Sequence, residues 1–270
     1  MHDPHNQMSA MADLSQILLA IPFVIAFLLY AAALLAANRK GRKWPIHRTL
    51  LWTAGIICSL AAVAGPLAVR AHFDFTAHML GHLLLGMLGP LLMAAAAPMT
   101  LFLRALRVKT AKRVTTVLKS WPVRIISDPI TASILNVGGL WVLYTTPLYE
   151  AMHESLLIHL FIHFHVFLAG YLFTISMVYF DPIPHRRSYL YRSAVMVVAL
   201  AGHGILSKYI YGNPPAGVPV SQAEKGSMLM YYGGDLIDIV IIFFICLHWY
   251  RSTRPRESFS RGLQTASPAD

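Results

Sequence analysis

Apolar residues in this chain come in long blocks separated by short polar segments. Each block holds about 20 residues, which is the length that a helix needs to cross the hydrocarbon core of a bilayer. The pattern therefore predicts an all-α, polytopic membrane protein. The blocks, interpreted as seven membrane-spanning helices, are 14–37, 49–69, 77–98, 127–146, 156–180, 193–211 and 229–250. We expect a seven-helix transmembrane domain over 14–250, an extracytoplasmic tail over 1–13 and a disordered basic tail over 251–270.

Composition supports this membrane assignment. Of the 270 residues, 56% are hydrophobic and 13% are charged, whereas a soluble domain carries about 25% charged residues. The net charge of +10 raises nucleic acid as a partner. However, the basic residues lie between the apolar blocks, as the positive-inside rule requires, so we expect a lipid bilayer and no nucleic acid. No connection is longer than 99–126, so a soluble catalytic domain is not expected and we predict no enzyme activity.

The basic residues also predict the orientation of the chain. Of the 22 Lys and Arg, 19 lie in four segments on one side of the predicted spans: 38–48, 99–126, 181–192 and 251–261. The other side holds only Arg70, Lys208 and Lys225. Because cytoplasmic connections carry the excess of positive charge, we predict that the N-terminus lies outside and the C-terminus in the cytoplasm.

Two histidine pairs stand out in the third and fifth predicted spans. His78 and His82 are four residues apart, and so are His159 and His163. This spacing is about one helical turn, so both imidazoles of each pair lie on one face of their helix. The Gly89-Pro90 pair predicts a kink two turns after His82.

Further ionisable residues lie at the same predicted depth. His203 lies in the sixth span, and Asp235 and Asp238 lie in the seventh. At about 1.5 Å per residue, these three and the four paired histidines fall roughly 3–14 Å below the outer surface. Because ionisable residues are expensive in a bilayer, we predict that all seven face one shared site.

The ligand types predict a metal. Imidazoles suit zinc, copper, nickel and iron, and thioethers favour Cu(I). Methionines near the outer side add such thioethers: Met79, Met152, Met228 and Met230. A copper-catching arm is expected in the N-terminal tail, with His2, His5, Met8 and Met11. We therefore predict copper, with zinc and haem as alternatives. Each pair lacks the intervening glutamate of an HExxH zinc protease.

Other interpretations of these residues remain open at this stage. His203 alone is typical of a hydrogen-bonded core histidine, and Asp235 with Asp238 suits a polar network with Lys208 or with histidines. A haem-binding redox protein ranks lower, because pairs about 6 Å apart are too close for two stacked porphyrins. A metal or proton transporter would use His203 and the two aspartates as a relay.

Several residues are predicted to lie outside the site. His165 points away from the His159–His163 pair, and His185 lies in a cytoplasmic loop. Cys58 and Cys246 form no CxxC motif, so we predict packing roles for them.

Taken together, the motifs resemble those of a known family. They are His78-Met79-x-x-His82, Gly89-Pro90-Leu91-Leu92, Ala97-Pro98-x-Thr100, Pro147-Leu148-Tyr149 and His159-x-x-x-His163. This pattern, over about residues 15–250, resembles the CtaG family of bacterial caa3-type cytochrome c oxidase assembly factors. The family often has Trp-His before the proline that ends the fourth span, whereas this chain has Tyr144-Thr145-Thr146.

The resemblance implies a role in assembling an oxidase. The expected place is the bacterial plasma membrane, and the expected partners are cytochrome c oxidase subunits. The outward-facing metal centre of a haem-copper oxidase needs copper from outside, which agrees with the predicted outer position of the histidines.

Overall fold

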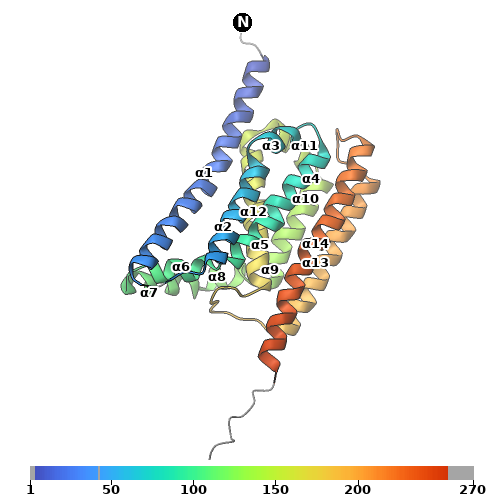
Figure 1. Ribbon diagram of the computed structural model, residues 1–270. Coiled ribbons are helices and arrows are strands. Elements are labelled where there is room, and N and C mark those ends of the chain that lie inside the picture. The colour runs from blue at the N-terminus through green and yellow to red at the C-terminus, as the bar shows by residue number, and fades with distance from the viewer. Residues whose placement is uncertain (1–3, 42, 255–270) are drawn as a thin grey trace, which may run out of the picture.

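The computed structural model describes residues 4–41 and 43–254, with side chains from residue 13 onward. Every regular element in these ranges is helical. The long helices stand side by side as a bundle (Figure 1). They are α1 (Pro4–Arg39), α2 (Ile46–Val63), α12 (Leu156–Met177), α13 (Tyr189–Gly212) and α14 (Val220–Thr253), together with one composite helix: α4 (Phe75–Leu83), η1 (Leu84–Leu88) and α5 (Gly89–Ala95).

Six of these helices are long and apolar enough to cross a membrane. Their spans are Asp13–Arg39, Ile46–Val63, Phe75–Ala95, Leu156–Met177, Tyr189–Gly212 and Val220–Thr253. They correspond to six of the seven predicted spans, so the all-helical, multi-pass architecture is confirmed. Residues 251–253, which were expected to be disordered, continue α14, and Arg254 is its C-cap. The rest of the predicted disordered tail lies outside the described residues.

The remaining predicted span, 127–146, is also helical but shorter. It consists of α9 (Pro129–Ser133), η2 (Ile134–Gly138) and α10 (Gly139–Thr145), which follow one another without a break. Their 5, 5 and 7 residues give a length of about 25 Å. In Figure 1 this run passes through the bundle from α9 at one end to α11 at the other.

Two proline positions end or change a helix. The second span was expected to continue to residue 69, but α2 ends at Val63. Gly65 has a φ of +86°, and Pro66 then begins α3 (Pro66–Ala71). Because proline lacks an N–H and its ring clashes with the carbonyl four residues earlier, α2 cannot continue through Pro66.

At Pro90 the helix continues by a different route. The residues before it widen into the π-helical segment η1, in which the Gly89 N–H donates to the Leu84 carbonyl. A π-turn accommodates the missing proline donor without ending the helix, and such turns are frequent at functional sites. The second π-helical segment, η2, lies on the neighbouring run between α9 and α10.

The close packing of α12 against η1 depends on two glycines. A Cβ atom added at Gly170 would lie 1.9 Å from the Gly86 carbonyl oxygen. Gly86 in turn leaves room for Val166 and for the ring of His82. The helices that carry the two histidine pairs therefore approach each other at backbone distance.

The connection between α5 and α9 forms three short helices at one end of the bundle. They are α6 (Pro98–Ala105), α7 (Val108–Leu118) and α8 (Trp121–Ile126). Figure 1 shows them lying across the end of the bundle where α1 and α14 finish. The opposite end carries α3 and α11 (Leu148–Glu154), next to the beginnings of α4 and α12.

Candidate metal site

His78 and His82 are positioned by a well-capped helix start. The Asp74 carboxylate accepts hydrogen bonds from the Thr76 and Ala77 N–H groups at 2.9 and 3.4 Å. It also forms a 2.9 Å ion pair with Arg70. Burial alone would raise the pKa of Asp74, but the Thr76 amide and Arg70 lower it overall. The charged carboxylate at the N-terminus of α4 is the favourable arrangement for a helix dipole.

His159 and His163 stack on each other one turn apart on α12. Their ring centroids are 4.1 Å apart, and His163 Nδ1 lies 2.9 Å from the His159 carbonyl oxygen. A carbonyl only accepts hydrogen bonds, so Nδ1 of His163 carries the proton and Nε2 keeps its lone pair. Metal-binding histidines commonly have their second nitrogen held in this way.

His78 has a different partner, from α10. Its Nε2 lies 3.0 Å from the Tyr144 hydroxyl, and that hydroxyl also contacts the Met79 sulfur at 3.8 Å. Tyr144 is buried. Tyr144, which precedes Thr145 in the fourth predicted span, therefore contacts the histidine site directly.

Two further histidines, His72 and His153, belong to the cluster, although they were not among the predicted site residues. The His72 ring stacks on His159 with centroids 5.5 Å apart, and it lies 6.2 Å from the His153 ring. Burial lowers the pKa of His72, and the nearby His153 lowers it further. Both effects favour the neutral form of the His72 imidazole, which offers a lone pair.

A repeat in the sequence would have revealed both residues. The pattern Pro-Leu-x-x-x-x-His-x-x-x-x-x-His-x-x-x-His begins at Pro66 and occurs again 81 residues later, at Pro147. The first histidine lies at the end of a short helix in each copy: His72 follows α3 directly, and His153 lies in the last turn of α11. The N-cap of the next helix, Asp74 or Ser155, follows this histidine by two residues. His72 and His153 were missed because they lie outside the predicted spans.

The histidines line a series of neighbouring cavities that share residues. An open cleft of about 300 Å³ at the α3–α11 end is bordered by His72 and His153. A cavity of about 20 Å³ follows, lined by both of these and by His78, His159 and His163. Cavities this small have room for about one water molecule or ion.

The series continues deeper into the bundle. A cavity of about 30 Å³ is lined by His78, His163, His82 and Met152. The next, of about 20 Å³, is lined by His82 together with His203 and Asp238. His82 therefore links an outer and an inner group of ionisable residues.

The inner group contains polar atoms without partners. His82 and His203 are each 6% exposed and Asp238 is 4% exposed. Within the part of the chain whose side chains are described, Nε2 of both histidines lacks a hydrogen-bond partner. Leaving such a buried atom unpaired is costly, so it points to an unassigned ligand, ion or water. Asp235 is only half-buried and lines none of the four cavities.

The seven predicted site residues are thus not arranged as one closed metal centre. Among residues 13–41 and 43–254, no three His, Cys, Asp or Glu side chains are placed to hold a metal ion together. The donor chemistry nevertheless fits a copper cargo, because imidazoles line each cavity and the Met152 thioether lines two of them. A haem does not fit into the three inner cavities, since their volumes of about 20, 30 and 20 Å³ are at least tenfold smaller than the pockets of about 300–1,000 Å³ that hold larger ligands.

Residues predicted to lie away from the site do so. His165 Nε2 hydrogen-bonds to the Leu135 carbonyl of η2 at 3.0 Å, and His185 Nε2 bonds to the Lys119 carbonyl at 3.2 Å. Cys58 and Cys246 are free thiols. Lys208 lies over the Tyr231 ring at 5.3 Å, and among the described side chains it forms no ion pair with Asp235 or Asp238.

The methionines predicted near the site lie in different surroundings, and the N-terminal arm is only partly described. Met79 and Met230 are fully buried in an apolar cluster, and Met228 is exposed. Of the arm, His2 lies outside the described residues. His5, Met8 and Met11 lie in the first turns of α1, and their side chains are outside the described part of the structure.

Comparisons with known proteins identify relatives and a family for this chain. Uncharacterized proteins of Mycobacterium bovis and Mycobacterium tuberculosis are each 32% identical over 183 residues, and one of Mycobacterium leprae is 29% identical over 181 residues. These matches cover 64% of this chain but only 27–28% of each relative, so the chain spans about a quarter of their length. No solved structure matches. The model of the cytochrome c oxidase caa3 assembly factor family, Caa3_CtaG, matches residues 28–252, and the chain therefore belongs to this family.

Proposed function

We propose that this protein is a membrane assembly factor that handles copper for a caa3-type cytochrome c oxidase and has no catalytic turnover. The family match supports the assembly role. The observation that supports the copper role is the series of separate cavities from the open cleft to Asp238, in which each neighbouring pair shares at least one lining histidine. In this proposal the oxidase subunits are the partners, and the protein acts in the bacterial plasma membrane.

Copper is the cargo in this proposal. His72 and His153 border the cleft and would receive the ion. His78, His159, His163 and Met152 would then hold it, because neutral imidazoles with one thioether suit Cu(I). His82, His203 and Asp238 form the deeper group. Asp235, which lines none of the cavities, is given no ligand role in this proposal. His82 lines both the 30 Å³ cavity and the deeper 20 Å³ cavity, so it would bind the ion as it passes from one to the other.

The proposed topology has seven spans, with the N-terminus and the histidine cleft outside. It counts 127–146 as a crossing, supported by its continuous helical run and its place in Figure 1. The placement of most basic residues at the opposite end supports a cytoplasmic position for that end.

Gene deletion tests the assembly role. Loss of this protein should lower the activity of a haem-copper oxidase, while transcripts of its subunits remain at their normal level. Reintroducing the wild-type chain should restore activity. Normal oxidase assembly in the deletion strain at both low and high copper would contradict the proposal.

Histidine variants test the copper role. Binding of Cu(I) to the purified protein is measured by competition with a chromophoric chelator, and oxidase maturation is measured in the complemented deletion strain. Alanine at any one of His78, His82, His159 or His163 should remove most binding and maturation. A second substitution should add little, because residues of one site act as a unit.

The matched control lies on the same helix. His165→Ala removes an imidazole from α12 that bonds to Leu135 instead, and it should keep both copper and maturation. An optical spectrum of the wild type separates haem from copper, since a Soret band would support haem. Folded His82→Ala and His163→Ala proteins with full copper binding and full maturation would refute the copper site.

A further inference from the structure

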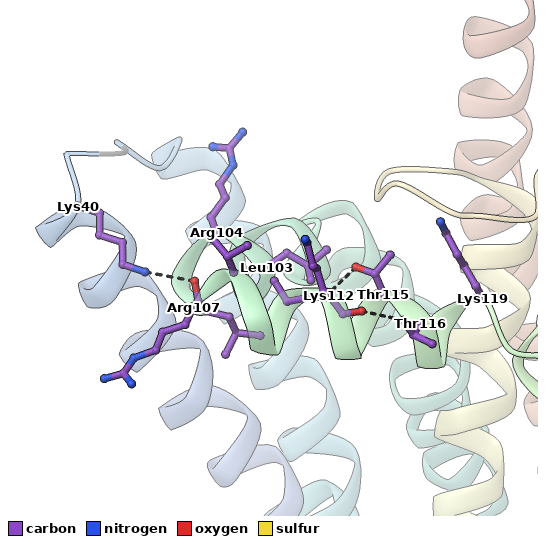
Figure 2. A pocket seen from close by; sticks show the side chains of 11 residues that line it. Lys40, Leu103, Arg104, Arg107, Lys112, Thr115, Thr116 and Lys119 are labelled. Carbon is purple, nitrogen blue, oxygen red and sulfur yellow. Dashed lines mark hydrogen bonds between the residues drawn. The ribbon is translucent and has the colours of Figure 1, made fainter.

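A large concave surface lies at the end opposite the histidine cleft. It has a volume of about 730 Å³ and lies between the C-terminus of α1 and helices α6 and α7 (Figure 2). Five basic residues contribute to its lining: Lys40, Arg104, Arg107, Lys112 and Lys119. Among the residues that the structure describes, none of those lining this cavity is acidic. Such a concentration of positive charge requires an anionic counterpart or solvent.

Two of the helices that border this basic cavity, α1 and α6, are held by specific contacts. The Lys40 ammonium donates to the Ala105 and Leu106 carbonyls at 2.7 and 3.3 Å, which ties α1 to the end of α6. At the beginning of α6, the Asp181 carboxylate accepts from the Met99 and Thr100 N–H groups at 3.0 and 2.7 Å. Helix α6 is therefore held at both ends, which fixes the α1–α6 side of the cavity.

The other cations of the cavity are available to a ligand. Arg107, Lys112 and Lys119 are exposed. In the part of the chain with described side chains, no carboxylate lies within ion-pair distance of any of the three. Figure 2 shows that their side chains extend from α7 and its two ends. Their charge is thus not neutralised within the protein.

The surroundings of the cavity are apolar as well as basic. Val108 is 72% exposed, Val117 62% and Trp121 72%, and all three lie on α7 or at the start of α8. A basic helix with exposed apolar residues that lies across the end of a helix bundle is typical of a helix in the membrane interface. Tryptophan is enriched at the same depth.

We propose that the basic cavity binds the headgroup phosphate of an anionic phospholipid. Lys112 and Lys119 lie two turns apart on one side of α7 and pair with the phosphate, whereas Arg107 at the N-cap adds to the positive charge around it. The adjoining valines and Trp121 contact the acyl chains. A phospholipid matches both features at once, whereas free phosphate would match only the charge. Phosphate recognition by lysine and arginine is chemically favourable, and basic pockets beside membrane helices bind anionic headgroups.

The experiment compares two triple variants with the same loss of charge. The full-length protein is reconstituted in phosphatidylcholine vesicles with one fifth phosphatidylglycerol and purified again, and the retained phosphatidylglycerol is quantified. The test variant is Arg107→Gln/Lys112→Gln/Lys119→Gln. The control is Lys109→Gln/Arg113→Gln/Arg124→Gln, whose residues lie on the same segment and do not line the cavity.

The test variant should lose phosphatidylglycerol by about tenfold or more, and the control by about twofold or less, because each basic residue near the headgroup contributes to binding. Melting temperatures should stay unchanged, since the substituted side chains are exposed. If the triple variant does not fold, Arg107→Gln and Lys112→Gln are measured singly and should each lose severalfold. Equal loss of phosphatidylglycerol from both triple variants would show that general charge attraction holds the lipid, and it would overturn the proposal. Displacement of the lipid by millimolar inorganic phosphate would identify a free-phosphate site and would also overturn it.

Discussion

Three aspartates at helix starts organise the two ends of the molecule. Asp74 caps α4 beside the histidine cleft. Asp181 caps α6 from a distant loop, 81 residues along the chain from Thr100. Asp128 accepts from the Ile130 N–H at 3.1 Å at the start of α9. Each carboxylate satisfies helix N–H groups that lack intrahelical partners, so each fixes where its helix begins.

Asp128 allows a test of how much such a carboxylate contributes to the free energy of unfolding. It pairs with Arg187 at 2.6 Å and accepts from the Tyr191 hydroxyl at 2.9 Å. The Asp128 side chain is only 12% exposed, so these contacts with a charged carboxylate help to hold the start of α9.

We therefore expect Asp128→Asn to lower the free energy of unfolding by about 0.5–2 kcal/mol at pH 7, a range set by the partly exposed Arg187. Asp128→Ala should cost about a further 0.5–1 kcal/mol, because asparagine still caps a helix and alanine does not. Thermal melts in detergent at pH 7 measure both variants. A wild-type melting temperature for Asp128→Asn would show that the charge contributes nothing.

At the level of single residues, the sequence predicted the histidines inside the spans but not those at the mouth. His78, His82, His159 and His163 were found because imidazoles are unusual inside apolar blocks. His72 and His153 lie in connecting segments, where a histidine is ordinary, and only the repeat that begins at Pro66 and Pro147 distinguishes them. The division into outer and inner groups depends on side-chain packing, which residue spacing does not encode.

At the level of elements, the contact between α12 and the composite helix α4–η1–α5 determines the geometry of the site. Gly170 lies against the backbone of Gly86, and Gly86 lies beside the ring of His82. Any side chain at this contact would separate His82 on one helix from His163 on the other. The glycines thus act on the site without contributing a ligand.

Gly170→Ala tests this contact. The new Cβ would lie 1.9 Å from the Gly86 carbonyl oxygen. Because that obstacle is backbone, the helices must move apart, and we expect a loss of stability of about 1–3 kcal/mol or more. Copper binding should fall although no ligand is changed.

The matched control for this contact is Gly138→Ala. Its Cβ would meet Ile134 at an ordinary 3.7 Å, so the change should be neutral or stabilise by up to about 1 kcal/mol through helix propensity. Thermal melts and chelator competition measure both variants. Wild-type stability and copper affinity in Gly170→Ala would show that the close approach is unimportant.

Element boundaries show where the sequence patterns stop being informative. Hydropathy located the six long helices, because the length of an apolar block is set by the bilayer. It placed the end of the second helix too late, since Ala64 and Leu67 are apolar while Gly65 and Pro66 break the helix. The two π-helical segments were not predicted, because a π-turn has the same composition as the α-helix around it.

At the scale of the whole molecule, two chemically distinct ends face opposite directions. The histidine cleft lies at the end that carries α3 and α11, and the basic cavity lies at the end that carries α6, α7 and α8. In the proposed orientation, copper enters from outside and anionic lipid anchors the cytoplasmic end. Both proposals therefore require that these ends lie on opposite sides of the membrane.

Reporter fusions test that requirement and the number of spans together. Reporters active only outside should work after residues 73, 151 and 218, and should fail after residues 42, 115, 187 and 262. The pair at 115 and 151 is decisive for segment 127–146, since its short helical run must cross for the two to differ. The same result at both positions would remove that crossing and leave an even number of spans. A consistent reversal at all seven positions would place the histidine cleft in the cytoplasm. Copper could then no longer reach His72 and His153 from outside, and the proposed route of supply would be wrong even if the histidines bind the ion.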